Sequence, residues 1–417
     1  MTPAARLQAT IEILDGLTAS NMPADRFIRE FFRARRYAGS KDRAGVAERV
    51  FQIYRHRASF AWRMGSEAPR AFVIASLLAD GADAGEVQSL FSGEGYGPAA
   101  LNDDERAALA HAPIGEPPLH VKGEFPQFLE SELVERFGEN LLPEMQAMTL
   151  RAPIDLRVNT PKATREAVLA ALRTDGYAAE PTPYAPHGIR IPSGAGAAHL
   201  ARHKAYEEGL FEFQDEAAQI ASLLCNAQPG MRVLDIAAGA GGKSLALAAA
   251  MNNEGSIVAT DVSAARLKQL ETRAARSGVS IVHVHADPRG VFERVLVDAP
   301  CSGSGTWRRQ PEQKWRLTPQ RLQALVQIQD ALLTRAAGHV APGGRLIYAG
   351  CSLLPSENES RIAAFLNRIS GFALVSAATI WREMSGTKPP PGLDEFLRVS
   401  PYAAGMDGFF TAVLVRA

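Results

Sequence analysis

Two cysteines, Cys301 and Cys351, each follow an apolar run that ends where a strand would end. Cys301 lies three residues after Asp298 and directly after Pro300, and Cys351 follows the apolar stretch 346–349. Read as buried strands, these runs deliver an acid and two thiols to the strands' carboxyl ends, where open α/β sheets place their ligands. We therefore expect Asp298, Cys301 and Cys351 to share one pocket. The alternative for either thiol is an inert buried position.

A glycine-rich turn follows another apolar run, 233–236, and opens an expected helix. Free amides at a helix start attract a carboxylate or a phosphate. The turn is not a P-loop, because Ala237 occupies the position that requires glycine, and it lacks the three-glycine dinucleotide fingerprint. With Asp235 at the strand end, it fits S-adenosylmethionine better. The residues expected to bind this cofactor are Ala237, Ala238, Gly239, Ala240, Gly241, Gly242 and Lys243.

Two more acids follow the next expected strands. Asp261 is placed to accept hydrogen bonds from a ribose diol, although it could instead cap a helix, a role for which Ser263 competes. Asp287 is placed to accept from an adenine amino group, the alternative being a turn residue before Pro288.

The elements that must position these residues alternate between strand and helix from Phe211 onwards. This alternation predicts an α/β fold, a doubly wound parallel sheet of about seven strands. The strands that we expect are 231–236, 256–261, 280–285, 293–298, 345–349 and 409–415, and the helices are 243–251, 264–277, 319–340 and 357–369.

The N-terminal part has a different pattern. Residues 1–92 read as all-helical, residues 93–123 as a Gly- and Pro-rich linker, and residues 124–204 as a small α+β extension. From 26 to 57 there are ten Arg or Lys against three Asp or Glu, interleaved with aromatic residues. This surplus indicates a face that neutralises RNA phosphates, the alternative being a solvated helix surface.

Composition limits the remaining possibilities. In 417 residues, 46% are hydrophobic, 22% are charged and the formal net charge is zero, as in an ordinary soluble globular protein. Three cysteines are too few for a disulfide framework, and Cys225 is expected to be structural. We find no metal-ligand spacing, no signal peptide and no membrane-spanning run. We therefore expect a cytoplasmic monomer without metal.

Two motifs carry a specific resemblance. The stretch Asp-Ala-Pro-Cys-Ser-Gly-Ser-Gly at 298–305, with Gly-Cys-Ser-Leu-Leu-Pro-Ser-Glu-Asn-Glu at 350–359, resembles the RsmB/Sun family of RNA cytosine-5 methyltransferases. The likeness extends over the chain: residues 205–417 resemble the methyltransferase domain, 124–204 the family's small N-terminal extension, and 1–92 a NusB-like RNA-binding domain. Departures are Ala237 and Ala240, where the family usually has Cys and Pro, and Gly350, where Thr is usual.

The resemblance implies a Rossmann-like, S-adenosylmethionine-dependent enzyme that methylates carbon 5 of a cytosine, with 16S ribosomal RNA as the expected partner. Cys351 would be the nucleophile that adds to carbon 6, and Cys301 would assist product release. The loop from Ala237 to Lys243, with Asp261, Asp287 and Asp298, would hold the cofactor or the base. Alternatives are the same chemistry on transfer RNA, or a non-catalytic RNA-binding assembly or regulatory factor. Residues expected to stack on bases or hold phosphates, unless they pack in a core, are Trp307, Arg308, Arg309, Lys314, Trp315 and Arg316.

Overall fold

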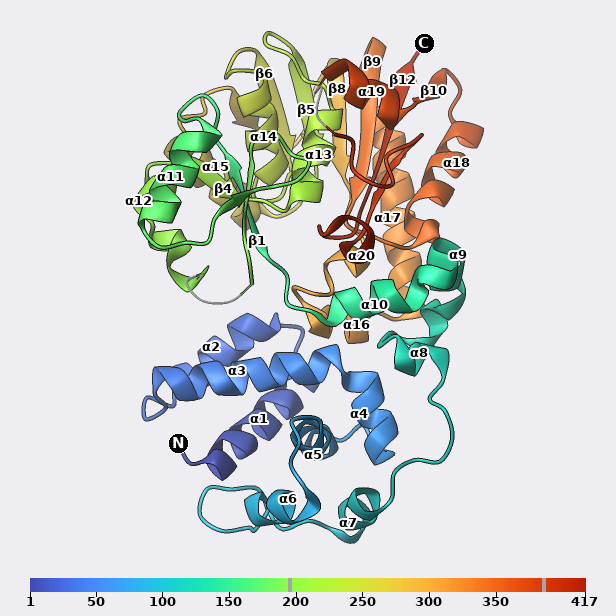
Figure 1. Ribbon diagram of the computed structural model, residues 1–417. Helices are drawn as coiled ribbons and strands as arrows, with labels where there is room; N and C mark the ends of the chain where they lie inside the picture. Colours follow the sequence, from blue (N-terminus) through green and yellow to red (C-terminus); the bar gives the residue numbers. More distant parts are fainter. Residues whose placement is uncertain (194–196, 385–387) are drawn as a thin grey trace. The chain divides into compact units, whose positions relative to one another are not determined.

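The computed structural model describes residues 1–193, 197–384 and 388–417, which form two compact units (Figure 1). The first unit comprises residues 1–150 together with the separate segment 307–318. The second comprises the rest of the described chain, from 151 to 306 and from 319 to 417. The domain boundaries expected from sequence, at 92, 123 and 204, differ from this division and remain predictions.

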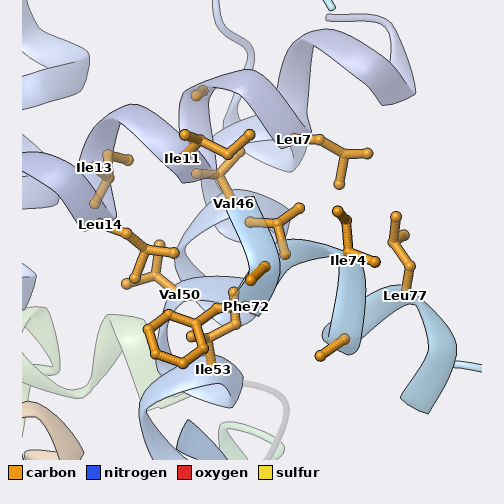
Figure 2. Packing of buried hydrophobic residues seen from close by; sticks show 14 of the residues in the cluster. Leu7, Ile11, Ile13, Leu14, Val46, Val50, Ile53, Phe72, Ile74 and Leu77 are labelled. Carbon is orange, nitrogen blue, oxygen red and sulfur yellow. The ribbon is translucent and has the colours of Figure 1, made fainter. Parts of the chain in front are cut away.

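The first unit is helical, as its pattern predicts. Helices α1, α3 and α5 form its centre, and their apolar faces meet in one core (Figure 2). The spacing of Ile11, Leu14 and Leu17 predicts this face, and all three are buried. The expected linker contains two helices, α7 and α8. The elements are α1 (Pro3–Thr18), α2 (Ala24–Arg33), α3 (Ser40–Arg55), α4 (Arg57–Met64), α5 (Pro69–Ala79), α6 (Ala84–Leu90), α7 (Asp103–Ala110), α8 (Leu119–Lys122), η1 (Gln127–Leu129), α9 (Glu130–Phe137), η2 (Gly138–Asn140), α10 (Leu141–Thr149) and, from the separate segment, α16 (Pro311–Arg316).

The second unit begins with a small antiparallel sheet of order β2-β3-β1-β4. Leu156 and Val158 of β1 pack against helix α11 in a core of their own. Strand β4 falls within the stretch assigned by sequence to the methyltransferase domain, but it pairs with β1 instead. The elements are β1 (Ile154–Val158), α11 (Arg165–Thr174), β2 (Glu180–Pro181), β3 (Gly188–Ile191), η3 (Ala197–Arg202), α12 (Lys204–Glu207) and β4 (Phe211–Phe213).

An eight-stranded sheet forms the rest of the second unit, in the order β10-β12-β9-β8-β5-β6-β7, with β11 added to β12. The five strands from β5 to β9 are parallel, which confirms the expected doubly wound core. Strand β12 is antiparallel to β9, and the sequence patterns did not predict β10 and β11. The strands are β5 (Arg232–Ile236), β6 (Ser256–Thr260), β7 (Val282–Val284), β8 (Phe292–Asp298), β9 (Val340–Gly350), β10 (Phe372–Val375), β11 (Leu397–Val399) and β12 (Phe409–Arg416).

Helices cover both faces of this sheet (Figure 1). Along β9, Ile347 and Ala349 point into the core shared with α13, α14 and α19, whereas Leu346 and Tyr348 point into the core shared with α17 and α18. This alternation is the two-residue period of a strand buried on both faces. The elements are α13 (Glu216–Leu224), α14 (Gly242–Ala250), α15 (Ala264–Ser277), η4 (Ser304–Thr306), α17 (Pro319–Ala337), η5 (Pro355–Glu357), α18 (Glu359–Arg368), α19 (Ala377–Met384) and α20 (Pro401–Ala404).

The parallel pairing brings three strand ends to one edge of the sheet. In β8 and β9 the register places Asp298 opposite Ala349, and in β5 and β8 it places Ile236 opposite Val297. The glycine turn and the two cysteine loops therefore leave the sheet next to one another. Across the described ranges, the structure holds no helix that combines the length and the apolar character needed to cross a bilayer.

Candidate active site

The two cysteines predicted to share a pocket lie next to each other. The Sγ atoms of Cys301 and Cys351 lie 3.4 Å apart, although 50 residues separate them in the chain. The loops that carry them are joined by backbone hydrogen bonds: the Ala299 amide donates to Ala349, and the Gly305 amide donates to the Cys351 carbonyl, each at 2.9 Å. The sulfur pair is thus fixed by the ends of two neighbouring parallel strands.

The two thiols are not equivalent. The hydrogen bond to Cys351 raises the pKa of Cys301 well above its ordinary value, and burial and the nearby Glu357 carboxylate raise it further. A raised pKa favours the protonated form of Cys301, and either thiol can be the donor across the pair. With Cys301 as the donor, its S–H group would stabilise negative charge on the Cys351 sulfur, and the role of Cys351 as nucleophile stays a prediction.

A partly buried ion pair lies beside the sulfur pair. The Lys243 Nζ is 2.7 Å from an Asp298 carboxylate oxygen and 4.9 Å from the centre of the Phe409 ring. Burial lowers the pKa of Lys243, but the Asp298 charge and hydrogen bond, with a contribution from Cys351, outweigh burial and raise it. Lys243 is thus a fixed cation. The Asp298 side chain is 33% exposed, so a ligand can still reach it.

The glycine turn has the backbone that a close ligand requires. Ala237, Gly239 and Gly241 all have positive φ angles, a conformation that glycine adopts without strain. Helix α14 begins at Gly242 and has no side-chain cap, so its first amides are available to an acceptor. Positions 237–243 therefore fit the predicted cofactor, S-adenosylmethionine, whose carboxylate would lie at the start of α14.

Asp261 and Asp287 behave differently from each other. The Asp261 carboxylate accepts from the Gly239 amide at 2.8 Å and from the Ser263 amide at 2.7 Å, and its side chain is only 3% exposed. Asp261 thus braces the glycine turn, while Ser263 caps α15. Asp287 is 81% exposed beside Arg289, with no recorded contact to the rest of the site in the described chain. Ribose binding by Asp261 and adenine binding by Asp287 stay predictions.

Asp235, at the end of β5, is fully buried beneath the turn. One carboxylate oxygen accepts from the Ser244 hydroxyl at 2.5 Å, and the other has no hydrogen-bond partner among the described residues. Burial raises the pKa of Asp235 to about 7, although the Ser244 hydrogen bond lowers it. An acid in this environment marks a site whose charge depends on what binds near it.

Three residues that hold the cysteine loops in place were not assigned a role from the sequence. The buried Glu357 carboxylate accepts hydrogen bonds from Ser302 and Ser352, the residues that follow the two cysteines. A recognisable signal was present, because a serine follows each cysteine and an acid lies six positions beyond Cys351.

For most of the group expected to contact RNA after Cys301, the structure supports the alternative of packing in a core. Trp307 and Lys314 are buried, and Lys314 lies over the rings of Trp307 and Trp315. The Trp315 indole donates to the Tyr54 carbonyl at 2.7 Å, and Arg316 donates to carbonyls at the end of α1 and just beyond it. This segment is a structural part of the first unit. Arg308 is buried as well, and Arg309 lies in the same segment.

Other chemistry-bearing residues have structural roles. Cys225 is buried, donates to the Ala221 carbonyl and has a pKa raised by burial to about 12, as expected of a structural thiol. Among the described residues, no three metal-ligating side chains gather in one place.

Family models match most of the second unit. Residues 222–415 match the model described as 16S rRNA methyltransferase RsmB/F, and residues 125–196 match a ferredoxin-like domain of the RsmF/B-like methyltransferases. The sequence resemblance to this family is thereby confirmed.

Curated relatives agree. The chain is 33% identical over 302 residues to ribosomal RNA small subunit methyltransferase B of Enterobacter sp. (strain 638), covering 70% of this chain and 66% of that protein. It is 32% identical over 317 residues to the methyltransferase B of Pseudomonas syringae pv. tomato, covering 74% and 68%. The matches thus span about two thirds of the relatives' length.

Solved structures share the fold. The crystal structure of PH0851 superposes with a TM-score of 0.78 at 26% identity, over 99% of both chains. NSun6 from Pyrococcus horikoshii, solved with SFG, gives 0.62 at 21% identity, over 70% of this chain and 98% of its own.

Proposed function

Because the chain belongs to the RsmB/F family of S-adenosylmethionine-dependent methyltransferases, we propose that it methylates carbon 5 of a cytosine in small-subunit ribosomal RNA. The observation that carries the proposal is the pair of sulfur atoms, 3.4 Å apart, beside the partly buried ion pair of Lys243 and Asp298. Ribosomal RNA is the substrate that the relatives' names state.

Cys351 begins the reaction. Carbon 5 of cytosine is a poor nucleophile, but a thiolate that adds to carbon 6 makes it enamine-like. Asp298 accepts a hydrogen bond from the exocyclic amine of the base, and the Lys243 ammonium offsets the negative charge that spreads through the ring. S-adenosylmethionine, when bound, supplies an electrophilic methyl group. The residues from 237 to 243 hold it next to the base.

Cys301 completes the cycle. Once the Cys351 sulfur is bonded to carbon, its charge and the hydrogen bond that is the largest cause of the raised pKa of Cys301 are gone, so Cys301 releases its proton to solvent more easily. Its thiolate then takes the carbon 5 proton. The electrons of that C–H bond form the carbon 5–carbon 6 double bond, and the carbon 6–sulfur bond breaks with its electron pair on Cys351.

The first unit supplies candidate RNA contacts. Six of the ten basic side chains at 26–57 form ion pairs with carboxylates. Arg33, Arg36 and Lys41 are exposed and enter no ion pair within the described residues. Unneutralised cations on one unit support phosphate binding.

A trapping experiment tests the roles. Cys301→Ala should accumulate a covalent protein–RNA complex with small-subunit RNA, Cys351→Ala should form none, and Cys225→Ala should turn over normally. The opposite pattern would exchange the two roles, and no complex with any variant would refute covalent catalysis.

Two measurements address the alternatives. If S-adenosylmethionine failed to bind near micromolar concentration in calorimetry, the non-catalytic assembly factor would be favoured. Bisulfite sequencing of cellular RNA with and without the protein distinguishes ribosomal from transfer RNA as substrate.

A further inference from the structure

One buried carboxylate contacts both cysteine loops. Glu357 is fully buried and accepts from the Ser302 amide at 2.8 Å and from the Ser302 hydroxyl at 2.5 Å. It also accepts from the Ser352 hydroxyl at 2.5 Å. Ser302 directly follows Cys301 and Ser352 directly follows Cys351, so a single side chain fixes the residue next to each sulfur.

Other groups fix Glu357 itself. The Gln329 amide of α17 donates to Glu357 at 3.0 Å and to the Pro300 carbonyl at 2.9 Å. The Tyr348 hydroxyl of β9 donates to the Glu357 carbonyl at 2.6 Å. The carboxylate therefore belongs to a rigid layer made from the sheet and the helix behind it.

The serines are bonded to each other as well. The Ser304 hydroxyl lies 3.2 Å from both the Ser302 and the Ser352 hydroxyls, and it accepts from the Leu353 amide at 2.8 Å. Four donors to an ionised, buried acceptor offset the cost of burying its charge, and such charge-assisted bonds are about twice as strong as neutral ones.

We propose that Glu357 is a positioning residue that holds the loops of Cys301 and Cys351 so that their sulfur atoms remain in contact. Within the described residues it has no hydrogen bond to either sulfur, and it positions the two loops through Ser302 and Ser352. Its importance for methylation rests on the proposed function, but the spacing of the two thiols does not.

The matched variants are Glu357→Gln and Glu359→Gln. Both remove one carboxylate charge from the same stretch, but the Glu359 carboxylate pairs with Arg398 at 2.6 Å, whereas the Glu357 carboxylate accepts from Ser302 and Ser352. Phenylarsine oxide, which binds only thiols close enough for one arsenic atom to bridge, reports sulfur spacing in the full chain without RNA. Cys301→Ala defines the signal without bridging.

We expect wild type and Glu359→Gln to bind one equivalent of the arsenical equally well. Glu357→Gln should bind the arsenical at least about tenfold more weakly than wild type. Ser352→Ala removes one of the hydrogen bonds to Glu357, and its affinity should lie between those of wild type and Glu357→Gln. The Glu357 charge also adds to the hydrogen bond and burial that raise the pKa of Cys301, so alkylation of Cys301 should shift to lower pH in Glu357→Gln.

In RNA methylation, Glu357→Gln should lower kcat by about 100-fold with little change in KM, as for a misplaced catalytic group. Wild-type arsenical binding by Glu357→Gln would overturn the positioning role. If Glu357→Gln does not fold, Ser302→Ala and Ser352→Ala decide the question by the same measurement. If the arsenical result holds but wild type methylates no RNA, the proposed function fails and the positioning role stands.

Discussion

Replacing Asp235 by Asn should remove a loss in the free energy of unfolding of the second unit that occurs as pH rises. Asp235 lies fully buried under the glycine turn, and its only hydrogen bond in the described chain comes from Ser244. Asparagine has the same shape and can still accept from Ser244 through its carbonyl oxygen. The substitution therefore isolates the cost of ionising a buried carboxyl group.

The magnitude follows from the pKa. Burial, opposed in part by the Ser244 hydrogen bond, raises the pKa of Asp235 from 3.8 to about 7. Between these values the folded state binds one proton more than the unfolded state, so the free energy of unfolding falls as pH rises. From pH 5 to pH 8 the loss is about 3 kcal/mol, at 1.36 kcal/mol per pH unit up to the folded-state pKa. The loss is nearly complete at about pH 8, because at pH 7 the folded-state group is only half ionised.

Urea unfolding at a series of pH values from 5 to 8 measures this effect. Hydrogen exchange of β5 and β8 amides should serve as the readout, because it reports the second unit alone. We expect the stability of Asp235→Asn relative to wild type to increase by about 3 kcal/mol over this range. A difference that stays constant with pH would show that Asp235 is ionised throughout, and the reasoning from burial would be wrong.

Three further outcomes are expected. Trp315→Ala should lower the free energy of unfolding of the first unit by about 3 kcal/mol, because packing and the hydrogen bond to the Tyr54 carbonyl are lost. Hydrogen exchange of the β5 amides, in the second unit, should not change. An unchanged stability of the first unit would contradict the structural role of the segment 307–318. Cys351→Ala should let iodoacetamide alkylate Cys301 at lower pH, because the hydrogen bond to Cys351 is the largest cause of the raised pKa of Cys301. Peptide mass spectrometry measures the alkylation of Cys301 at each pH. An alkylation profile that does not move along the pH scale would show that this hydrogen bond is absent. Arg33→Ala with Arg36→Ala should reduce the slope of log K against log salt for RNA binding by about 1.5, with stability unchanged, and an unaltered slope would exclude these arginines from the RNA interface.

Much of the structure at the carboxyl ends of β5, β8 and β9 could be predicted from the sequence, because the signals for it are local. The helix expected at 264–277 is found as α15 (Ala264–Ser277), since Ser263 caps its start and Gly278 takes the left-handed conformation at its end. The strands that carry Asp298 and Cys351 are long apolar runs, and parallel pairing then brings their ends together. Two cysteines that each follow a strand were enough to predict that their side chains lie close together.

What could not be predicted depends on distant contacts. The helix at 311–316 was not predicted, and no local pattern in this segment indicates that it packs in the first unit. Glu357 lies in the motif at 350–359, in which only Cys351 was assigned a role from the sequence. Its bonds to Ser302 and Gln329 join three parts of the chain that no local pattern connects.

The segment 307–318 also affects how the chain is made. Residues 1–150 leave the ribosome long before the piece that Tyr54 and the end of α1 must bind. At ordinary elongation rates, the delay is about 10–30 s. Throughout this interval the nascent helical unit lacks part of its own structure, and it is completed only after the loop bearing Cys301 has been synthesised. A product interrupted before position 307 would therefore lack a finished helical unit.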